Sequence, residues 1–388
     1  MTVPQSRFAF LGAILLGVNL AGEVPGTYKS ASVELTSPKE HQVFQRSSRE
    51  SGIAMIEGDA LLVENTQTAR IQVRVVSAKE PEREITPWVL LTVDLTNNHF
   101  RQDIPLPAGG WYSVEVRIQE GEKPWVQKKV EHVGVGEVFL IAGQSNSANH
   151  GEGRLRPESD QVVAFDGTHW QLAEDPQPGA SGDGGSFIPA FGDALFRHLH
   201  VPIGIVATGA GGTSVREWLP KGEAMAAPPT TGANTLTIGT NHWESTGDLY
   251  QRLIARGHSL GPTGFRAVLW HQGESDNHQP EGRNITPEQY QEYLRIVIRR
   301  SRADWGREVP WFVAQASYHT LEQTGSPELR AAQLAVASGG FALAGPNTDE
   351  LGMPYRESNG HGVHFNRQGL IRHGELWAEV VSRWLDGM

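Results

Sequence analysis

The chain has 388 residues, which is more than one typical domain and enough to bury a large core. It carries 33 Lys and Arg against 44 Asp and Glu, a formal net charge of −11, and no basic block, which argues against nucleic acid as the main partner. It contains no cysteine, so disulfides, thiolate catalysis and cysteine-ligated metals are excluded.

The first segment is typical of a secretory signal peptide. Residues 1–7 carry one positive charge, and the apolar stretch FAFLGAILLGVNLA follows at 8–21. This stretch is too short to span a bilayer comfortably. We therefore expect residues 1–30 to be a signal peptide and leader and the protein to be secreted or periplasmic, with no stable membrane insertion after signal removal. A buried N-terminal element is the alternative.

Residues 33–134 are expected to form a β-sandwich-like domain. The runs ARIQVRVV (69–76), WVLLTVDLT (88–96) and WYSVEVRIQE (111–120) show alternation or β-branched enrichment, and Pro, Gly and Asn clusters separate them. Short strands at this spacing indicate a small sandwich. No cluster of catalytic residue types occurs in this region.

Residues 136–388 alternate strand-like and helix-like segments. Apolar runs at 137–143, 201–212, 265–273, 309–318 and 341–347 alternate with helical patterns at 187–200, 247–260, 286–306, 326–338 and 366–387. Such alternation predicts an α/β fold, a parallel sheet with helices on both faces. Ligand sites in such sheets lie at the carboxyl ends of the strands, so the residues just after each apolar run are the candidates.

The first run ends in Gly143-Gln144-Ser145-Asn146. A serine in a strand-to-helix turn can expose its hydroxyl as a nucleophile, but it can equally be an ordinary helix N-cap. The stretch is not the G-x-S-x-G elbow, because its fifth residue is Ser147. Taken alone, this tetrapeptide does not decide between the two interpretations.

Polar or glycine-rich segments also follow the second and third runs. Gly211 and Gly212 let the backbone approach a ligand, and their N–H groups could face an oxyanion, although a simple glycine-rich turn fits as well. His271, Gln272 and Glu274 follow the third run. Gln272 offers an amide donor, and Glu274 could orient another residue.

The last candidate segment is RESNGHGVHFNRQG, before the final helical pattern. His364 could be a general base that comes from the far end of the chain, or a helix-flanking histidine in a polar loop. A metal site formed by His361, His364 and His150 is disfavoured, because the loop contains glycine and no nearby carboxylate pattern. We expect no metal and no organic cofactor.

The order of these segments is more specific than any one of them. Gly-Gln-Ser-Asn, then Gly-Gly-Thr with a following Trp, then His-Gln-Gly-Glu, resembles the SGNH hydrolases over about residues 136–388. The branch that the chain resembles is that of sialate O-acetylesterases and acetylxylan esterases (carbohydrate esterase family six and relatives). The resemblance implies a flavodoxin-like three-layer α/β/α domain and a metal-independent serine esterase.

The resemblance also implies roles for individual residues. Ser145 matches the family nucleophile and His364 the family base. The oxyanion donors would be the N–H groups of Ser145 and Gly211 and the side chain of Gln272. Asn146 would support the loop.

One position departs from the family pattern. The family usually has Asp three residues before the catalytic histidine, and His361 occupies that place here. An imidazole cannot supply the fixed negative charge that stabilises the imidazolium form of His364. Glu274 is therefore our predicted acid. A Ser–His dyad and an impaired enzyme are the alternatives.

The expected reaction is removal of acetyl groups from O-acetylated carbohydrate through an acyl-enzyme. Trp218 could stack on a sugar, and Arg216 could bind a carboxylate such as that of a sialic acid, although both residues fit packing or salt-bridge roles too. The sequence does not choose between xylan, sialic acid and other acetylated saccharides. The alternative functions are a non-catalytic carbohydrate-binding protein of the same fold and a short-chain lipase or thioesterase.

Overall fold

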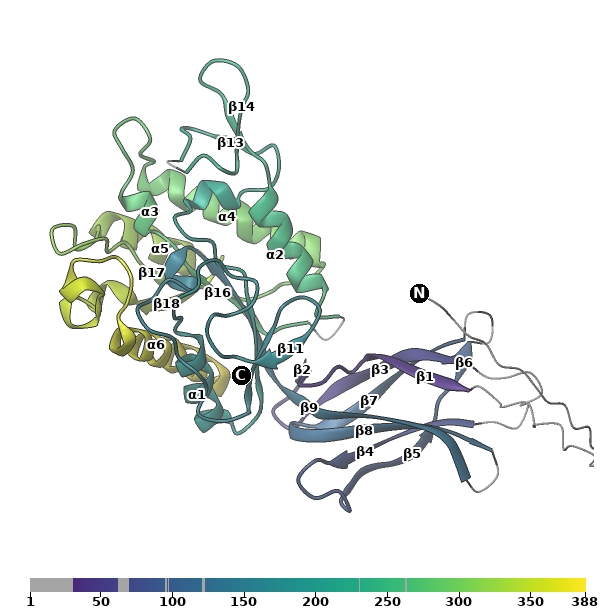
Figure 1. Ribbon diagram of the computed structural model, residues 1–388. Helices are drawn as coiled ribbons and strands as arrows, with labels where there is room; N and C mark the ends of the chain where they lie inside the picture. The colour runs from purple at the N-terminus through teal and green to yellow at the C-terminus, as the bar shows by residue number, and fades with distance from the viewer. Residues whose placement is uncertain are drawn as a thin grey trace, which may run out of the picture.

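The computed structural model describes residues 31–61, 70–94, 96, 98–120, 123–229, 231–261 and 264–388 (Figure 1). The predicted signal peptide, residues 1–30, lies outside these ranges, so its prediction stays untested. Among the helices in the described ranges, none combines the length and the apolar character that crossing a bilayer requires.

The N-terminal part consists of two β-sheets around one core. One sheet has the order β1-β3-β7-β6. In the other sheet, β4 pairs with β5 and β8, and β9 pairs with β8 and β2. Alternate residues such as Val73, Val75, Val114 and Val116 are fully buried between the sheets, as the alternating pattern predicts. The bounds are β1 Ser32–Ser37, β2 Val43–Gln45, β3 Ser51–Leu61, β4 Arg70–Ser77, β5 Glu84–Leu90, β6 Val93–Asp94, β7 His99–Pro107 and β8 Gly109–Glu120.

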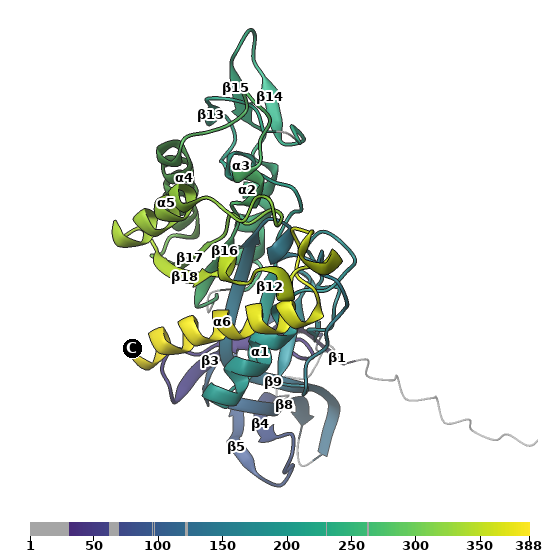
Figure 2. The ribbon, with the colours of Figure 1, turned by 90° about the vertical axis from the view of Figure 1, so that its left-hand side faces the viewer.

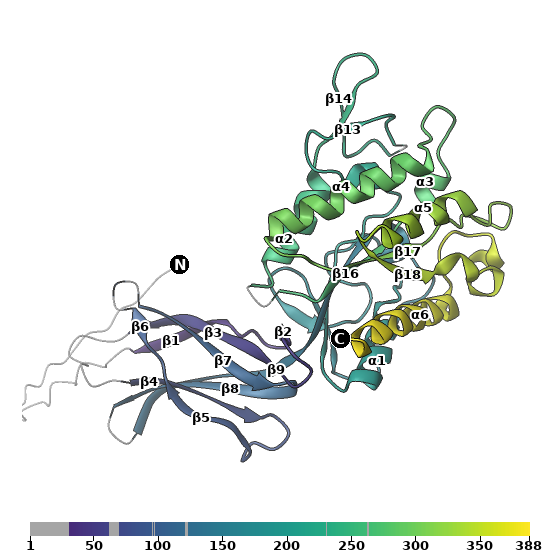
Figure 3. The same cartoon turned by 180° about the vertical axis from the view of Figure 1, so that it is seen from behind.

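One long strand, β9 (Lys123–Gly143), connects the two parts of the molecule. Its first half pairs antiparallel with β8, and its second half pairs parallel with β12 and β16 (Figures 1 and 3). The boundary expected near residues 134–136 therefore falls inside a continuous strand. The candidate site at Ser145 begins two residues after this strand ends.

The C-terminal part is built on a mostly parallel sheet. The strand order is β11-β10-β12-β9-β16-β17-β18, and only β11, at the edge, is antiparallel to its neighbour. The strands are β10 Val162–Phe165, β11 Trp170–Leu172, β12 Ile203–Ala207, β16 Ala267–His271, β17 Trp311–Gln315 and β18 Leu343–Asn347. The five predicted strands are confirmed. The short strands β10 and β11 were not predicted.

Helices cover both faces of this sheet (Figure 2). Along β9, Phe139 and Ile141 belong to one core with α1 and α6, whereas Leu140 and Ala142 belong to the opposite core with α2, α4 and α5. A strand buried on both faces reads as a continuous apolar run, which explains the sequence pattern. The helices are α1 Ile188–Leu199, α2 Asp248–His258, α3 Glu274–Asn277, α4 Pro287–Trp305, α5 Pro327–Ser338 and α6 Arg367–Asp386.

Short elements lie at the carboxyl edge of the sheet. A small sheet of β13 (Ala224–Met225), β15 (Trp243–Ser245) and β14 (Thr235–Thr237) projects beyond α2 and α4 (Figure 1). Within the described ranges, the loops also contain the 3-10 turns η1 Ser145–Ser147, η2 Val215–Trp218, η3 Thr348–Glu350, η4 Met353–Tyr355 and η5 Ser358–Gly360.

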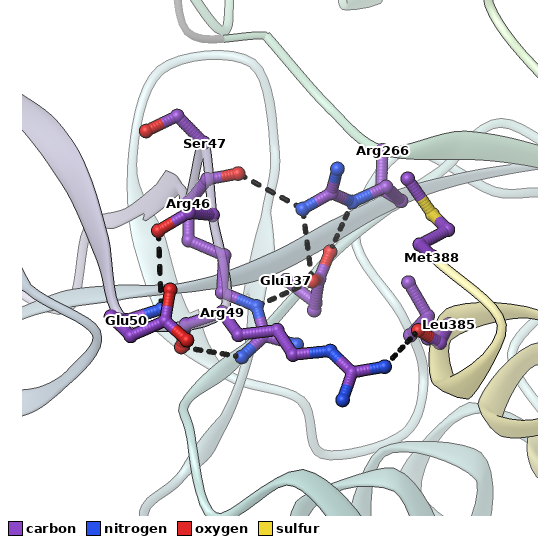
Figure 4. Close-up of a pocket in the computed structure, with 9 residues that line it drawn as sticks. Arg46, Ser47, Arg49, Glu50, Glu137, Arg266, Leu385 and Met388 are labelled. Carbon is purple, nitrogen blue, oxygen red and sulfur yellow. Dashed lines mark hydrogen bonds and ion pairs between the residues drawn. The ribbon is translucent and has the colours of Figure 1, made fainter.

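A buried ion cluster fixes the junction between the two parts. The carboxylate of Glu137, on β9, is fully buried and accepts hydrogen bonds from Arg46 Nε at 2.6 Å and Arg266 Nε at 2.7 Å. Gln45 Nε2 donates a further bond at 2.9 Å. Figure 4 shows both guanidinium groups directed at Glu137, beside a cavity of about 410 Å³. The cluster joins the loop after β2 to the start of β16.

Candidate active site

Ser145 lies at the carboxyl end of the central strand. Gly143 ends β9 with φ +128, and a Cβ atom there would lie 1.9 Å from the backbone oxygen of His271. Only glycine therefore allows β9 and β16 to approach this closely before the chain turns. Ser145 then opens η1. Within the described residues, neither its Oγ nor its backbone N–H has a hydrogen-bond partner. The hydroxyl and the amide are both available for a ligand.

His364 is paired with a carboxylate that the sequence analysis did not predict. Its Nδ1 is 2.8 Å from Glu357 Oε1, and its backbone N–H donates to the same oxygen at 3.1 Å. The two residues face each other because the chain folds back: Arg356 and Phe365 form an antiparallel bridge, and Glu357 N–H donates to His364 O at 3.0 Å. The hydrogen bond from His364 is the main cause that lowers the pKa of Glu357. Glu357 is therefore an ionised partner for His364.

Asn146 holds the loops of Ser145 and His364 together. Its Nδ2 donates to the backbone oxygen of Val363, the residue before His364, at 3.2 Å. The His150 ring stacks on that of His364, with 5.5 Å between the ring centroids. The contact between Asn146 and Val363 places Ser145 and His364 in adjacent loops. The Ser145 hydroxyl and the imidazole make no direct hydrogen bond here, which is common in free enzymes.

Glu274 does not contact His364. Its Oε1 accepts hydrogen bonds from Asn146 Nδ2 at 2.7 Å and His271 Nε2 at 2.9 Å, and the side chain is buried. Glu274 therefore does not hold the place next to His364 that we predicted for it, and Glu357 does. Sequence position alone could not distinguish them, because each is a glutamate within a polar segment.

Gln272 also differs from its predicted role. Its amide nitrogen is fully buried and already donates to Asp276 Oδ2 at 2.7 Å and Thr213 O at 3.1 Å. Both amide hydrogens are thereby used, so Gln272 supports the glycine-rich loop and does not offer a free donor to an oxyanion. Gln144 is similarly structural: its Oε1 accepts the N–H of Ser275 at 2.9 Å and ties β9 to α3.

The glycine-rich loop lies beside His150. The N–H of Gly211 donates to Ser181 Oγ at 2.7 Å, and Ser181 Oγ is 3.0 Å from His150 Nε2. Burial and the neighbouring His364 lower the pKa of His150, so its imidazole is neutral near pH 7. In this state the Gly211 N–H is occupied. The N–H of Gly212 has no partner within the described ranges.

Arg216 and Trp218 are packing residues. Arg216 is fully buried, its Nε donates to Ser214 Oγ at 2.9 Å, and its Nη1 donates to the backbone oxygen of Ala227 at 2.8 Å. Its guanidinium also pairs with buried Asp276 at 3.5 Å. Trp218 is fully buried, and its Nε1 donates to Thr213 Oγ1 at 3.1 Å. The predicted carboxylate binding by Arg216 and sugar stacking by Trp218 are not compatible with this burial.

His361 lies apart from the His364–Glu357 pair. Its side chain is 62% exposed, and its Nδ1 is 3.9 Å from Glu322 Oε1. Within the described part of the chain, one group of three side chains has donor atoms close enough to share a metal ion, namely Glu40, His41 and His132 in the N-terminal part. The histidines around Ser145 do not form such a group.

Comparison with known proteins finds one family model and several similar solved structures. Residues 135–383 match the family model described as carbohydrate esterase, sialic acid-specific acetylesterase. A solved carbohydrate acetylesterase from Xanthomonas citri is similar, with a TM-score of 0.55 and 20% identity over 92% of this chain and 76% of that chain. An Arabidopsis thaliana protein gives 0.45 and 20% identity over 63% and 98% of the two chains. A family 2 carbohydrate esterase from Myceliophthora fergusii gives 0.38 and 14% identity over 92% and 100%. No curated protein matched the chain.

Proposed function

Because the chain belongs to the sialic acid-specific acetylesterase family of carbohydrate esterases, and is thus a carboxylic ester hydrolase, we propose that it deacetylates O-acetylated carbohydrate with Ser145, His364 and Glu357 as its catalytic triad. The observation that carries the proposal is the 2.8 Å contact between Glu357 Oε1 and His364 Nδ1. Glu357 supplies the carboxylate that His361, in the family's usual Asp position, cannot supply.

The proton positions follow from this contact. An ionised Glu357 accepts the proton on Nδ1, so the lone pair of His364 is on Nε2. Nε2 takes the Ser145 proton as the serine oxygen attacks the acetyl carbonyl. The imidazolium that forms lies against the Glu357 charge, and it then protonates the departing sugar oxygen. Water clears the acyl-enzyme by the reverse route.

The developing oxyanion needs N–H donors that are not already used. The backbone N–H of Ser145 meets this requirement, and so does that of Gly212. The N–H of Gly211 donates to Ser181 Oγ, so it would serve as a further donor only after that hydrogen bond breaks. Each such donor stabilises the transition state by about 3 kcal/mol in comparable sites. Gln272 acts here by holding the glycine-rich loop in place.

The finer fold assignment belongs to the same proposal. We infer a flavodoxin-like SGNH domain and a β-sandwich-like N-terminal domain. The support is the strand order: with β9, β12, β16, β17 and β18 counted in chain order, the sheet runs 2-1-3-4-5. Secretion stays a prediction from the N-terminal sequence, and the identity of the acetylated saccharide is left to experiment.

The test is acetate release from 4-nitrophenyl acetate and from acetylated xylo-oligosaccharides and O-acetylated sialic acid. We expect turnover by the native protein and loss of at least about 10³-fold in Ser145→Ala. Turnover of aryl acetate without release from any acetylated saccharide would reject the carbohydrate substrate. Equal rates for native protein and Ser145→Ala would reject the nucleophile.

A further inference from the structure

A chain of buried polar side chains runs beneath the Ser145 loop. Trp377 Nε1, on α6, donates to His373 Nε2 at 3.0 Å, and His373 Nε2 is 3.0 Å from His271 Nδ1 on β16. His271 Nε2 is 2.9 Å from Glu274 Oε1, which also contacts Asn146 Nδ2 at 2.7 Å. Every member of the chain is 4% exposed or less. Because so many buried polar groups are in contact, each proton between them must be assigned to a donor.

The chemistry of the donors fixes those protons. The Trp377 indole can only donate, so His373 Nε2 is an acceptor, and the proton between the two histidines therefore belongs to His271 Nδ1. Burial alone raises the pKa of Glu274, but His271 outweighs it and lowers the pKa to about 2. Glu274 is thus a carboxylate, which accepts the hydrogen bond from Asn146 Nδ2 and lies 2.9 Å from His271 Nε2. The network contains a buried pair, the Glu274 carboxylate and His271.

Asn146 connects this pair to the catalytic residues. One hydrogen of its amide points to Glu274 and the other to the backbone oxygen of Val363. The amide cannot flip, because Oδ1 would then face the Glu274 carboxylate. Asn146 follows Ser145 in the chain, and Val363 precedes His364. The orientation of one amide thereby sets the separation of the two loops.

We propose that Glu274, held by His271, is a positioning residue that sets the geometry between Ser145 and His364 through the side chain of Asn146. This role rests on the proposed function, and it is distinct from that of Glu357, which contacts the base directly. The charge of Glu274 strengthens its hydrogen bond with Asn146, because a hydrogen bond to a carboxylate is about twice as strong as one between neutral groups. Misplacement of a reacting group by about 1 Å can cost about 10²-fold in rate.

The experiment is a double-mutant cycle on kcat for 4-nitrophenyl acetate with Asn146→Ala, Glu274→Gln and the double variant. We expect each single change to lower kcat by about 10- to 100-fold, with KM within about twofold. Because Glu274 acts through Asn146, the double variant should be no slower than Asn146→Ala alone. Multiplied effects of the two changes would overturn the proposal, and so would full activity of either single variant.

Two controls separate positioning from loss of folding and from failure of the proposed function. Glu137→Gln changes another fully buried glutamate, at the domain junction, and should lower the melting temperature without changing kcat. Labelling of Ser145 by a fluorophosphonate probe reports nucleophile geometry without any acetyl substrate. If native protein is labelled but turns over no ester, the proposed function fails, and the same cycle on labelling rates still decides the positioning role. If Glu274→Gln does not fold, the test rests on Asn146→Ala, which should slow the labelling of Ser145. An unchanged labelling rate in Asn146→Ala would reject the positioning role.

Discussion

Glu357 Oε1 accepts two hydrogen bonds from His364, one from the ring Nδ1 at 2.8 Å and one from the backbone N–H at 3.1 Å. The first fixes the tautomer of the base, and the second fixes the position of the carboxylate relative to the chain that carries the base. The hairpin between them contains Ser358 and Asn359, both with left-handed φ. In the proposed triad, a pair of residues across a hairpin takes the place of the family's usual Asp-x-x-His arrangement.

The first prediction concerns this pair. Glu357→Gln should lower kcat for aryl acetate by about 10²- to 10⁴-fold, because the amide no longer balances the imidazolium charge and can favour the wrong tautomer. Steady-state kinetics with protein of verified fold would measure it. His361→Ala, a change at the position where the family has its Asp, is the matched control and should retain activity within about threefold, since His361 is largely exposed. The opposite ranking of the two variants would show that Glu357 is not the triad acid.

The sequence predicts a site residue well when its role follows from its place after a strand. It predicts poorly a residue whose role depends on which side chain it contacts in the fold. Ser145 follows an apolar strand, and β9, β12, β16, β17 and β18 form where apolar runs were found, because strands buried on both faces leave that pattern. Strand β10 has four residues and β11 three, too few for a periodic signal. Glu357 became the partner of His364 through the register of a hairpin, and the sequence indicates the turn but not the register.

Burial explains why three of the predicted site residues cannot act as we expected. Three predicted residues lie near the ends of strands, where ligands bind in such sheets, yet the side chains of Gln272, Arg216 and Trp218 are fully buried. A sequence gives the residue type and the approximate edge of the sheet, but not whether a neighbouring loop covers the side chain. The Ser-Asn-Gly in RESNGHGVH was the available signal for a tight hairpin, since Asn and Gly tolerate the left-handed region.

The second prediction is that Arg216 maintains the fold and does not select substrates. Arg216→Met should lower the free energy of unfolding by about 3 kcal/mol, because it leaves the buried Asp276 without its cation. Urea unfolding would measure this. The ratio of kcat/KM between neutral and carboxylate-bearing acetylated sugars should not change. Lys221→Met, an exposed cation of the following loop, is the control for stability. A stable Arg216→Met that loses only the carboxylate-bearing substrate would contradict the buried geometry.

The third prediction uses His373. Burial lowers its pKa well below 6.5, so below pH 6.5 the unfolded chain binds a proton that the folded chain does not. Stability therefore falls as pH falls through this window, by up to about 1.4 kcal/mol per pH unit from this group. Unfolding curves at pH 7.5, 6.5 and 5.5 should show a smaller loss for His373→Gln, whose amide oxygen still accepts from Trp377. Parallel pH dependences of the two proteins would mean that His373 does not contribute to it.

The fourth prediction concerns the ion cluster at the domain junction. Glu137 is the shared acceptor for Arg46 and Arg266, which come from opposite sides of the junction, and all of its contacts are made away from water. Glu137→Ala leaves two guanidinium groups partly or fully buried without their carboxylate, which should cost about 3–5 kcal/mol of stability. Differential scanning calorimetry would measure the fall in melting temperature.

The Glu137→Ala variant also tests whether the ion cluster affects only the junction or the site at Ser145 as well. Glu137 lies on β9 near its entry into the parallel sheet, whereas Ser145 follows the other end of that strand. Since the strand from 139 to 141 pairs with β12 on one side and β16 on the other, the change should not reach Ser145 below the melting temperature. We therefore expect kcat for aryl acetate at 25 °C within about twofold of native. A large fall in kcat at full folding would instead mean that the junction transmits strain along β9 to the nucleophile, and that the N-terminal part influences catalysis.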